Sequence, residues 1–224
     1  MKINSKTGKK RPPPETTREP SVYTDDEVSR LVQAIPTRSV MGLRNRALLM
    51  VYYRSGIRCA EGLALRPHDL DREHHTVRVT HGKGGKFRVV GMDDGAFEFV
   101  DRWIDARARL RVTASSPLFC SRNGKALPTS YVRKMLVRLG EKTKIEKRVH
   151  CHGFRHTMAS EMLRSGEPLS VISHQLGHER LSTTDTYLQK IEPSDVIRAM
   201  SRRKLDPAKF SPDGVGKKNR KGRR

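Results

Sequence analysis

The chain is poor in the features that mark secreted and membrane proteins. Its 224 residues include three cysteines, Cys59, Cys120 and Cys151, whose odd number and irregular spacing argue against a disulfide framework. They favour a reducing compartment instead. No apolar run is long enough to span a bilayer, and no signal peptide opens the chain. We therefore expect a cytoplasmic protein, associated with the nucleoid if its source is bacterial.

Acidic residues are also scarce. There are 24 Asp and Glu against 46 Lys and Arg, which gives a net charge of +22. A field of this sign attracts polyanions, and nucleic acid is the obvious partner. Residues 1–20 hold six Lys and Arg against two Glu, and residues 201–224 hold ten against two Asp. We expect a basic, proline-containing arm over 1–22, one folded domain over 23–203 and a basic, disordered tail over 204–224.

The spacing of apolar residues predicts a mostly helical domain. Thr24, followed by three acidic residues and an apolar stripe, marks the start of a helix. Helical spacing continues over residues 40–54, 58–66, 93–111, 129–144, 152–165, 169–176, 183–190 and 193–203. The period changes to two over 76–80 and 87–90, around a glycine-rich tip, which predicts a β-hairpin. Residues 69–71 indicate a turn. The predicted fold class is mainly α with a small antiparallel β-sheet (α+β).

Several short motifs carry the residue types that strand transfer at a phosphodiester needs. Such a reaction requires a nucleophile, fixed positive charge on the phosphorane, and groups that take and give protons. Arg58 and Arg155 each offer a planar, always charged fork to phosphate oxygens. Glu61 follows Arg58 by three residues on the same helix face, where it can orient that arginine. Taken alone, an arginine on a helix is usually a solvated surface group, and a lone histidine such as His152 is more often structural.

The order and spacing of these motifs resemble the catalytic domain of the tyrosine recombinase (phage integrase) family. Residues 55–69 resemble the first arginine box, with Arg58 and its acidic partner Glu61. Residues 152–159 resemble the second box, with His152 and Arg155 in His-x-x-Arg. Leu176-Gly177-His178 resembles the Leu-Gly-His motif, Tyr187 stands nine residues later in the position of the nucleophile, and Lys83 in the hairpin tip resembles the β-hairpin lysine. The resemblance covers roughly residues 23–200.

The resemblance implies a site-specific DNA recombinase or integrase that forms a covalent 3′-phosphotyrosine. Tyr187 would attack the phosphate, with His152 as base and Lys83 as the acid that protonates the leaving oxygen. Arg58 and Arg155 would hold the charge, and His178 would donate a hydrogen bond to the phosphate. No cofactor and no metal are implied; the partners are double-stranded DNA and three further copies of the chain in a homo-tetramer. The other tyrosines, Tyr23, Tyr52, Tyr53 and Tyr131, are poorer candidates because they fall in apolar or amphipathic helices or in the N-terminal approach.

Other interpretations remain for some motifs. His150, Cys151 and His152, or His174 with His178, are possible zinc ligands, but they lack the further Cys and His pairs of zinc sites. The loop 82–86 lacks the spacing of a phosphate-binding P-loop. Arg133, Lys134 and Arg138 are either solvated charges or a face that follows a DNA groove. A type IB topoisomerase-like strand transferase and a non-recombining DNA-binding regulator are the alternative functions. Most family members carry a separate DNA-binding domain before the catalytic one, whereas about 22 residues precede it here, so the chain is a short member or a truncated one.

Overall fold

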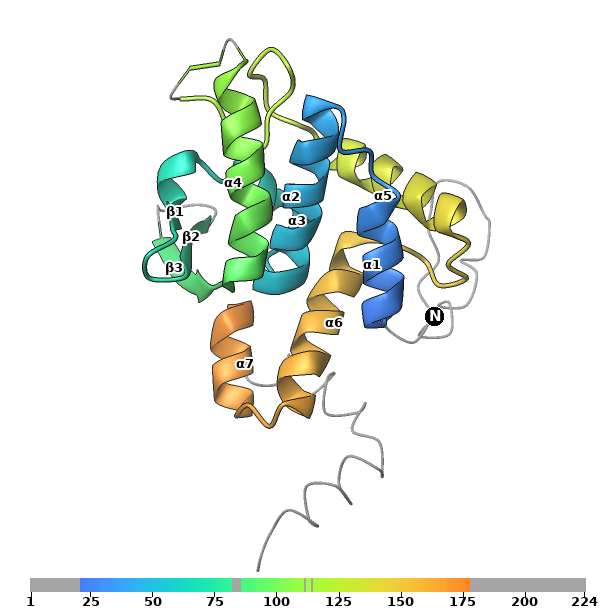
Figure 1. The fold of residues 1–224 in the computed structure, drawn as a ribbon. Helices are drawn as coiled ribbons and strands as arrows, with labels where there is room; N and C mark the ends of the chain where they lie inside the picture. The colour runs from blue at the N-terminus through green and yellow to red at the C-terminus, as the bar shows by residue number, and fades with distance from the viewer. Residues whose placement is uncertain (1–20, 82–85, 111, 114, 178–224) are drawn as a thin grey trace, which may run out of the picture. The chain divides into compact units, whose positions relative to one another are not determined.

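The computed structural model describes residues 21–81, 86–110, 112–113 and 115–177 (Figure 1). The helices predicted over 183–190 and 193–203 and the tail over 204–224 lie outside these residues. The described part is mostly helical with one three-stranded antiparallel sheet, so the predicted fold class is confirmed. Its elements are α1 (Asp25–Gln33), α2 (Val40–Ser55), α3 (Cys59–Ala64), η1 (Pro67–Asp69), β1 (Leu70–Asp71), β2 (Thr76–His81), β3 (Lys86–Gly91), α4 (Asp94–Ala108), α5 (Thr129–Thr143), α6 (Cys151–Arg164) and α7 (Leu169–Leu176).

The sheet has the strand order β1-β2-β3. The predicted hairpin is confirmed, with Val79 opposite Arg88 and Thr76 opposite Gly91. The predicted turn over 69–71 is wrong, because Leu70 and Asp71 pair with β2 as a third strand. Pro67 starts the short 3-10 helix η1, and the chain leaves it directly into β1. A strand of two residues is too short to produce a period-two pattern, so the sequence did not indicate it.

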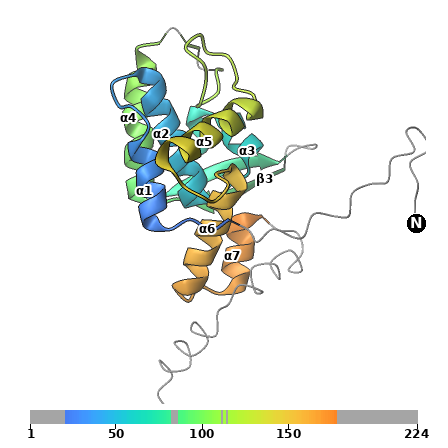
Figure 2. The same cartoon turned by 90° about the vertical axis from the view of Figure 1, so that its right-hand side faces the viewer.

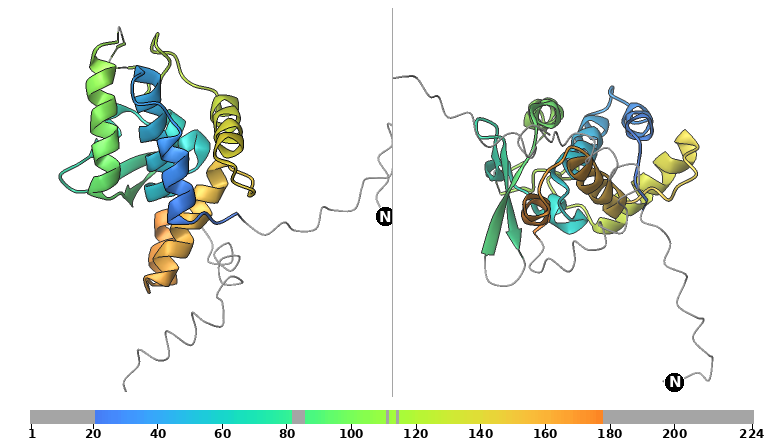
Figure 3. Two further views of the ribbon diagram at one scale, coloured as in Figure 1. Left: turned by 45° about the vertical axis from the view of Figure 1, so that its right-hand side comes forward. Right: turned by 90° about the horizontal axis from the view of Figure 1, so that it is seen from below.

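Helix α2 lies at the centre of the core. It packs against α4, α6 and α3, and nine of its sixteen residues are buried on all sides of the helix (Figures 1 and 2). On α4, Trp103 is fully buried and its indole Nε1 donates to the carbonyl of Leu118 at 2.9 Å. A smaller apolar cluster joins α6 to α7, which lie side by side (Figure 3). Its buried members are Met158, Ala159, Ile172 and Leu176.

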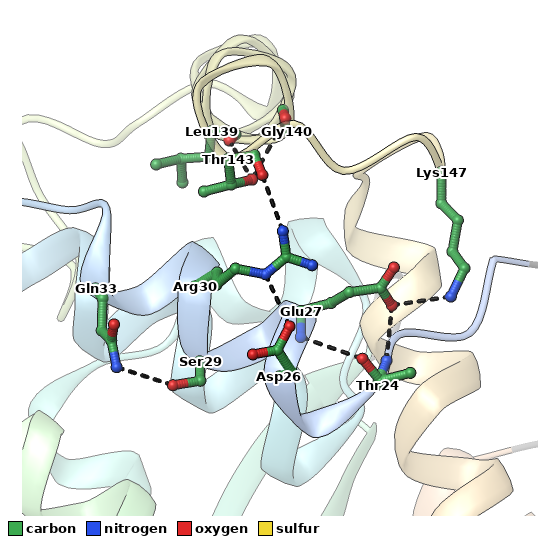
Figure 4. Close-up of polar contacts among 10 residues, drawn as sticks. All are labelled: Thr24, Asp26, Glu27, Ser29, Arg30, Gln33, Leu139, Gly140, Thr143 and Lys147. Carbon is green, nitrogen blue, oxygen red and sulfur yellow. Dashed lines mark hydrogen bonds and ion pairs between the residues drawn. The ribbon is translucent and has the colours of Figure 1, made fainter.

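Helix α1 begins with the predicted cap and is tied to α5 by polar contacts (Figure 4). The Thr24 hydroxyl accepts from the Glu27 amide at 3.2 Å, and the Glu27 carboxylate accepts from the Thr24 amide at 2.8 Å. That carboxylate also pairs with Lys147 at 2.9 Å, and Arg30 donates to the Thr143 carbonyl at 3.1 Å. The capping residue Glu27 therefore both satisfies the amide at the start of α1 and binds Lys147, which follows α5.

The third helix is shorter than the predicted span of 58–66. It covers only Cys59–Ala64, and Arg58 is its N-cap with extended backbone angles. Leu65 and Arg66 are also extended. A proline disfavours helical backbone angles in the residue before it, here Arg66. The helix ends two residues earlier still, at Ala64, and not at Arg66 as the sequence pattern predicted.

Candidate active site

Arg58 lies just after a sharp reversal of the chain between α2 and α3. Gly56 ends α2 in the left-handed region, with φ of 64°, and an added Cβ would lie 2.0 Å from the Cε of Met158. Glycine takes this φ without strain, and a larger residue would also have to displace the Met158 methyl. The Arg58 side chain is 47% exposed, and its Nη1 donates to Glu61 Oε1 at 3.0 Å. The turn thus presents a guanidinium at the surface with one edge held by a carboxylate.

Glu61 connects two arginines from different elements. Besides Arg58, it accepts two hydrogen bonds of 2.9 Å from Nη1 and Nη2 of Arg88, which makes a bidentate pair. Its side chain is only 9% exposed. Burial by itself raises the pKa of this carboxyl, but the hydrogen bonds from Arg88 and from the backbone and side chain of Arg58 outweigh it and lower the pKa from 4.5 to about 2. Glu61 is therefore ionised at neutral pH and holds α3 against β3.

Arg88 is a site residue that our sequence analysis missed. Its neighbours Phe87 and Val89 are 61% and 45% exposed, whereas Arg88 is turned inward with the buried Val90. A strand normally buries its apolar face, so this alternation is inverted. The inner position of Arg88 follows from the pairing of β2 with β3, which places it opposite the buried Val79. A charged residue on the inner face requires a partner, but the residue pattern of the strand alone did not reveal it.

Arg88 also lies against the start of the Leu-Gly-His motif. Gly177 ends α7 with φ of 66°, and a Cβ added there would lie 2.4 Å from Arg88 Nε and 2.8 Å from its Cζ. Hydrogen bonds also join α7 to β3 and α2, since the Gln175 side chain donates to the carbonyls of Ser55 and Gly91 at 3.0 and 2.9 Å. The end of α7 is thereby fixed next to β3 and the end of α2.

Arg155 is almost fully buried, with 2% exposure. Its Nη1 donates to the carbonyl of Gly56 and its Nη2 to the carbonyl of Leu176, both at 2.7 Å. These carbonyls belong to the ends of α2 and α7, where the partial negative charge of a helix dipole gathers. The positive charge of Arg155 therefore caps two helices at once, and it brings the three sequence motifs of the described region together.

His152 lies in the first turn of α6, next to this cluster. Its ring makes an edge-to-face contact with that of His156, with 4.4 Å between centroids. Partial burial lowers the pKa of His152 below 6.5, and the positive charges of Arg155 and Arg58 lower it further. His152 is consequently neutral near pH 7, the state in which an imidazole can accept a proton.

Tyr23 fixes the start of α6. Its ring lies over Gly153, where a Cβ would come within 2.2 Å of the phenol oxygen. The hydroxyl donates to the carbonyl of Arg148 at 2.9 Å and accepts from the amide of His150 at 3.0 Å. The chain segment that enters α1 thus holds the backbone that carries His152.

Of the seven site residues predicted from the sequence, four lie together in the described structure: Arg58, Glu61, His152 and Arg155. Lys83, His178 and Tyr187 lie outside the described residues. Within the same described ranges, no group of three or more His, Cys, Asp and Glu is arranged to hold a metal ion. Over that part of the chain, too, no helix is long and apolar enough to cross a bilayer.

Comparison with known proteins identifies relatives of this chain. The profile of the Phage integrase family matches residues 21–192. Tyrosine recombinase XerC of Shewanella sp. (strain ANA-3) is 35% identical over 162 residues, which cover 72% of this chain and 53% of that protein. XerC of Xanthomonas axonopodis pv. citri (strain 306) is 38% identical over 168 residues, which cover 75% and 53%. The chain thus spans about half the length of these curated relatives.

Solved structures show the same fold. The crystal structure of XerA recombinase superposes with a TM-score of 0.72 and 28% identity, over 85% of this chain and 68% of that one. XerH recombinase bound to its palindromic difH substrate, in a post-cleavage complex, gives a TM-score of 0.69 and 25% identity, over 83% and 54%.

Proposed function

The chain belongs to the phage integrase family, and from that premise we propose that it is a site-specific DNA recombinase that cleaves and rejoins strands through a covalent 3′-phosphotyrosine. One observation carries this proposal. Arg155 bonds to Gly56 beside Arg58 and to Leu176 in the Leu-Gly-His motif, so positive charge from distant motifs converges on one place. A converging set of guanidinium groups is what a phosphorane dianion requires.

We assign the nucleophile to Tyr187, partly because the other phenols are occupied. Burial raises the pKa of Tyr23 to about 12 and also raises those of Tyr52 and Tyr53. Tyr131 donates to Asn45 at 3.1 Å and lies beside the guanidinium of Arg44. All four of these hydroxyls are engaged in hydrogen bonds within the described domain.

The proposed reaction is a transesterification that conserves the phosphodiester energy. The Tyr187 oxygen gives its proton to neutral His152 and attacks phosphorus in line with the leaving 5′-oxygen. Arg58 and Arg155 stabilise the phosphorane, with a hydrogen bond from His178, and Lys83 protonates the departing 5′-oxygen, which leaves as a hydroxyl. A second 5′-hydroxyl reverses these steps and releases the tyrosine. The arginines supply the fixed charge that Mg²⁺ supplies elsewhere, so a chelator should leave cleavage unchanged.

A nicked suicide duplex tests the nucleophile. On this substrate the short cleaved strand diffuses away and the covalent complex accumulates, so we expect an adduct that resists denaturant. Tyr187→Phe should abolish it, and the matched variant Tyr131→Phe should retain it. An adduct formed by Tyr187→Phe would disprove the assignment.

The proposed partners are duplex DNA and further copies of the chain. XerH has been crystallised on its difH substrate, and this chain carries a net charge of +22. Exchange of four strands needs four nucleophiles, so we propose a homo-tetramer on DNA. The basic arm over 1–22 and the tail over 204–224 flank the proposed catalytic domain over 23–203.

A further inference from the structure

The first turn of α6, which carries His152, is held by a residue far away in the sequence. Tyr23 precedes α1 and is only 2% exposed, and its ring contacts that of Phe154 with 4.9 Å between centroids. Its backbone amide donates to the hydroxyl of Thr157 at 2.8 Å, and that hydroxyl donates to the carbonyl of Gly153 at 2.9 Å. Tyr23 thus binds α6 through its ring and its backbone, and it binds the loop before the helix through its hydroxyl.

These contacts lie on the face of α6 opposite to the candidate active site. With 3.6 residues per turn, Gly153 and Thr157 lie on one face of the helix, and His152 and Arg155 lie on the other. Arg155 fixes its own face by two hydrogen bonds of 2.7 Å to the ends of α2 and α7. The position of His152 therefore depends on both sets of contacts.

His150 caps the same turn with its side chain. Its Nδ1 accepts from the amide of Gly153 at 3.0 Å, which requires that this nitrogen carry no proton. Burial lowers the pKa of His150 below 6.5, in keeping with that state. The Tyr23 hydroxyl holds the backbone of the cap, since it accepts from the His150 amide at 3.0 Å and donates to the Arg148 carbonyl at 2.9 Å. The cap is neutral, so it adds no negative charge two residues from His152.

We infer that Tyr23 and His150 are positioning residues for strand cleavage, which together fix the start of α6 so that His152 can act as the base. The catalytic part of this inference rests on the proposed function; the placement of His152 does not. Tyr23 is buried and the Nδ1 of His150 is turned to the helix, so both act through His152, whose side chain is exposed. An error of about 1 Å in the position of a catalytic group can lower a rate roughly 100-fold.

An NMR titration of His152 tests the placement without any DNA. In the wild type the ring should titrate below pH 6.5, because partial burial and the positive charges of Arg155 and Arg58 lower its pKa. In Tyr23→Phe we expect the first turn to relax, which solvates the ring and takes it away from those charges, so the pKa should rise toward 6.5. The signal is identified by its loss in His152→Asn. An unchanged pKa in Tyr23→Phe would overturn the inference.

Tyr53→Phe is the matched control. The Tyr53 hydroxyl donates to Glu161 at 2.7 Å, near the other end of α6, so this variant also removes a partly buried hydrogen bond to the same helix. Both variants should lower the melting temperature, but only Tyr23→Phe should move the titration of His152. A shift of equal size in Tyr53→Phe would show that any loosening of α6 has this effect, and would remove the special role of Tyr23.

Single-turnover cleavage of the suicide duplex tests the catalytic part. Tyr23→Phe should lower the plateau rate roughly 10- to 100-fold with unchanged affinity for the duplex, because the buried Tyr23 cannot touch DNA. The fall of the rate at low pH should begin at a higher pH than in the wild type, in step with the pKa of His152. A loss that appears only in the affinity, or a pH profile that does not move, would count against a positioning role.

Two variants of His150 separate the cap from proton transfer. Asn also caps helices well, so His150→Asn should keep most of the rate and the fall at low pH, whereas His150→Ala should lose rate as Tyr23→Phe does. Equal losses in both variants, or disappearance of the fall in His150→Asn, would assign proton transfer to His150 itself. If the wild type does not cleave at all, the proposed function fails, while the NMR titration still decides whether Tyr23 positions His152.

Discussion

At the scale of single residues, Glu61 fixes the position of the Arg58 side chain by hydrogen bonds. Its carboxylate accepts hydrogen bonds from both Arg58, the N-cap of α3, and Arg88 on β3. With its pKa lowered to about 2, it remains charged through the whole physiological range. The folded state loses this stabilisation only as the pH falls from about 4.5 toward 2, because the unfolded chain takes up the proton first.

Glu61→Gln should therefore lower the free energy of unfolding at pH 7, on the order of 2 kcal/mol after allowance for solvent screening. The difference from the wild type should shrink as the pH falls through that window. Urea unfolding at pH 7 and in steps to pH 2 measures it. Glu98→Gln is the matched control, since Glu98 pairs with Arg102 on the exposed surface at 3.9 Å and should cost under about 1 kcal/mol. A pH-independent difference would refute this account.

Protonation of His152 should cause the fall of the cleavage rate at low pH, that is, the acidic limb of the pH–rate profile. Burial and the nearby arginines lower its pKa below 6.5, so the rate should be level above pH 6.5 and should fall only at lower pH. His152→Asn should remove the limb and lower the plateau roughly 10²–10⁴-fold. Single-turnover cleavage across pH gives both quantities. His174→Asn, on the exposed face of α7, should change neither, and a limb that persists in His152→Asn would assign the base to another group.

The arginines show how far sequence reasoning reaches at this scale. The spacing of Arg58 and Glu61 predicted their pairing, and the structure confirms it. The same reasoning missed Arg88, because the partner of a strand residue depends on which helix packs over that strand. It also did not foresee that Arg155 donates to the carbonyls of Gly56 and Leu176. Such contacts join segments far apart in sequence, and no local pattern specifies them.

At the scale of elements, the sequence was most reliable where a cap or an apolar stripe defined a helix. Thr24 and Glu27 marked the start of α1, and the predicted span 169–176 matches α7. It was least reliable for the short pieces after Arg58, where α3 ends early and β1 was taken for a turn. Elements of two to six residues contain too few positions to show a period, and their form depends on tertiary contacts.

The junction of α7 with β3 predicts the effect of an added methyl group. Gly177→Ala combines a strained positive φ with contact at 2.4 Å to Arg88. Gly166→Ala is the matched control, because Gly166 also has a positive φ, 87°, but nothing lies within 4 Å of its added Cβ. We expect Gly166→Ala to cost about 1 kcal/mol of stability and Gly177→Ala about 1–3 kcal/mol more. Thermal or urea unfolding of both variants measures this difference, and equal costs would show that Arg88 simply moves aside.

At the scale of the whole molecule, the net charge of +22 is the property on which the proposed binding to DNA depends most. Within the described residues, Arg133, Lys134 and Arg138 lie exposed along α5, where they suit contact with phosphates as well as with water. The first 20 and last 24 residues add a further excess of positive charge. Phosphate contacts position a protein on DNA without specifying a sequence, so the ends should contribute affinity rather than selectivity.

Deletion of 202–224 should reduce the salt dependence of DNA binding more than it reduces base discrimination. The segment holds ten Lys and Arg, and each phosphate contact adds about 0.9 to the slope of log K against log salt. Fluorescence anisotropy between 50 and 300 mM salt, on cognate-like and scrambled duplexes, measures both. A variant with the same 23 residues in shuffled order should keep the wild-type slope, because its charge is unchanged. Replacement of its basic residues by Gln should lower the slope as the deletion does. If deletion leaves the slope unchanged, the tail does not lie on DNA and serves only to keep the chain in solution.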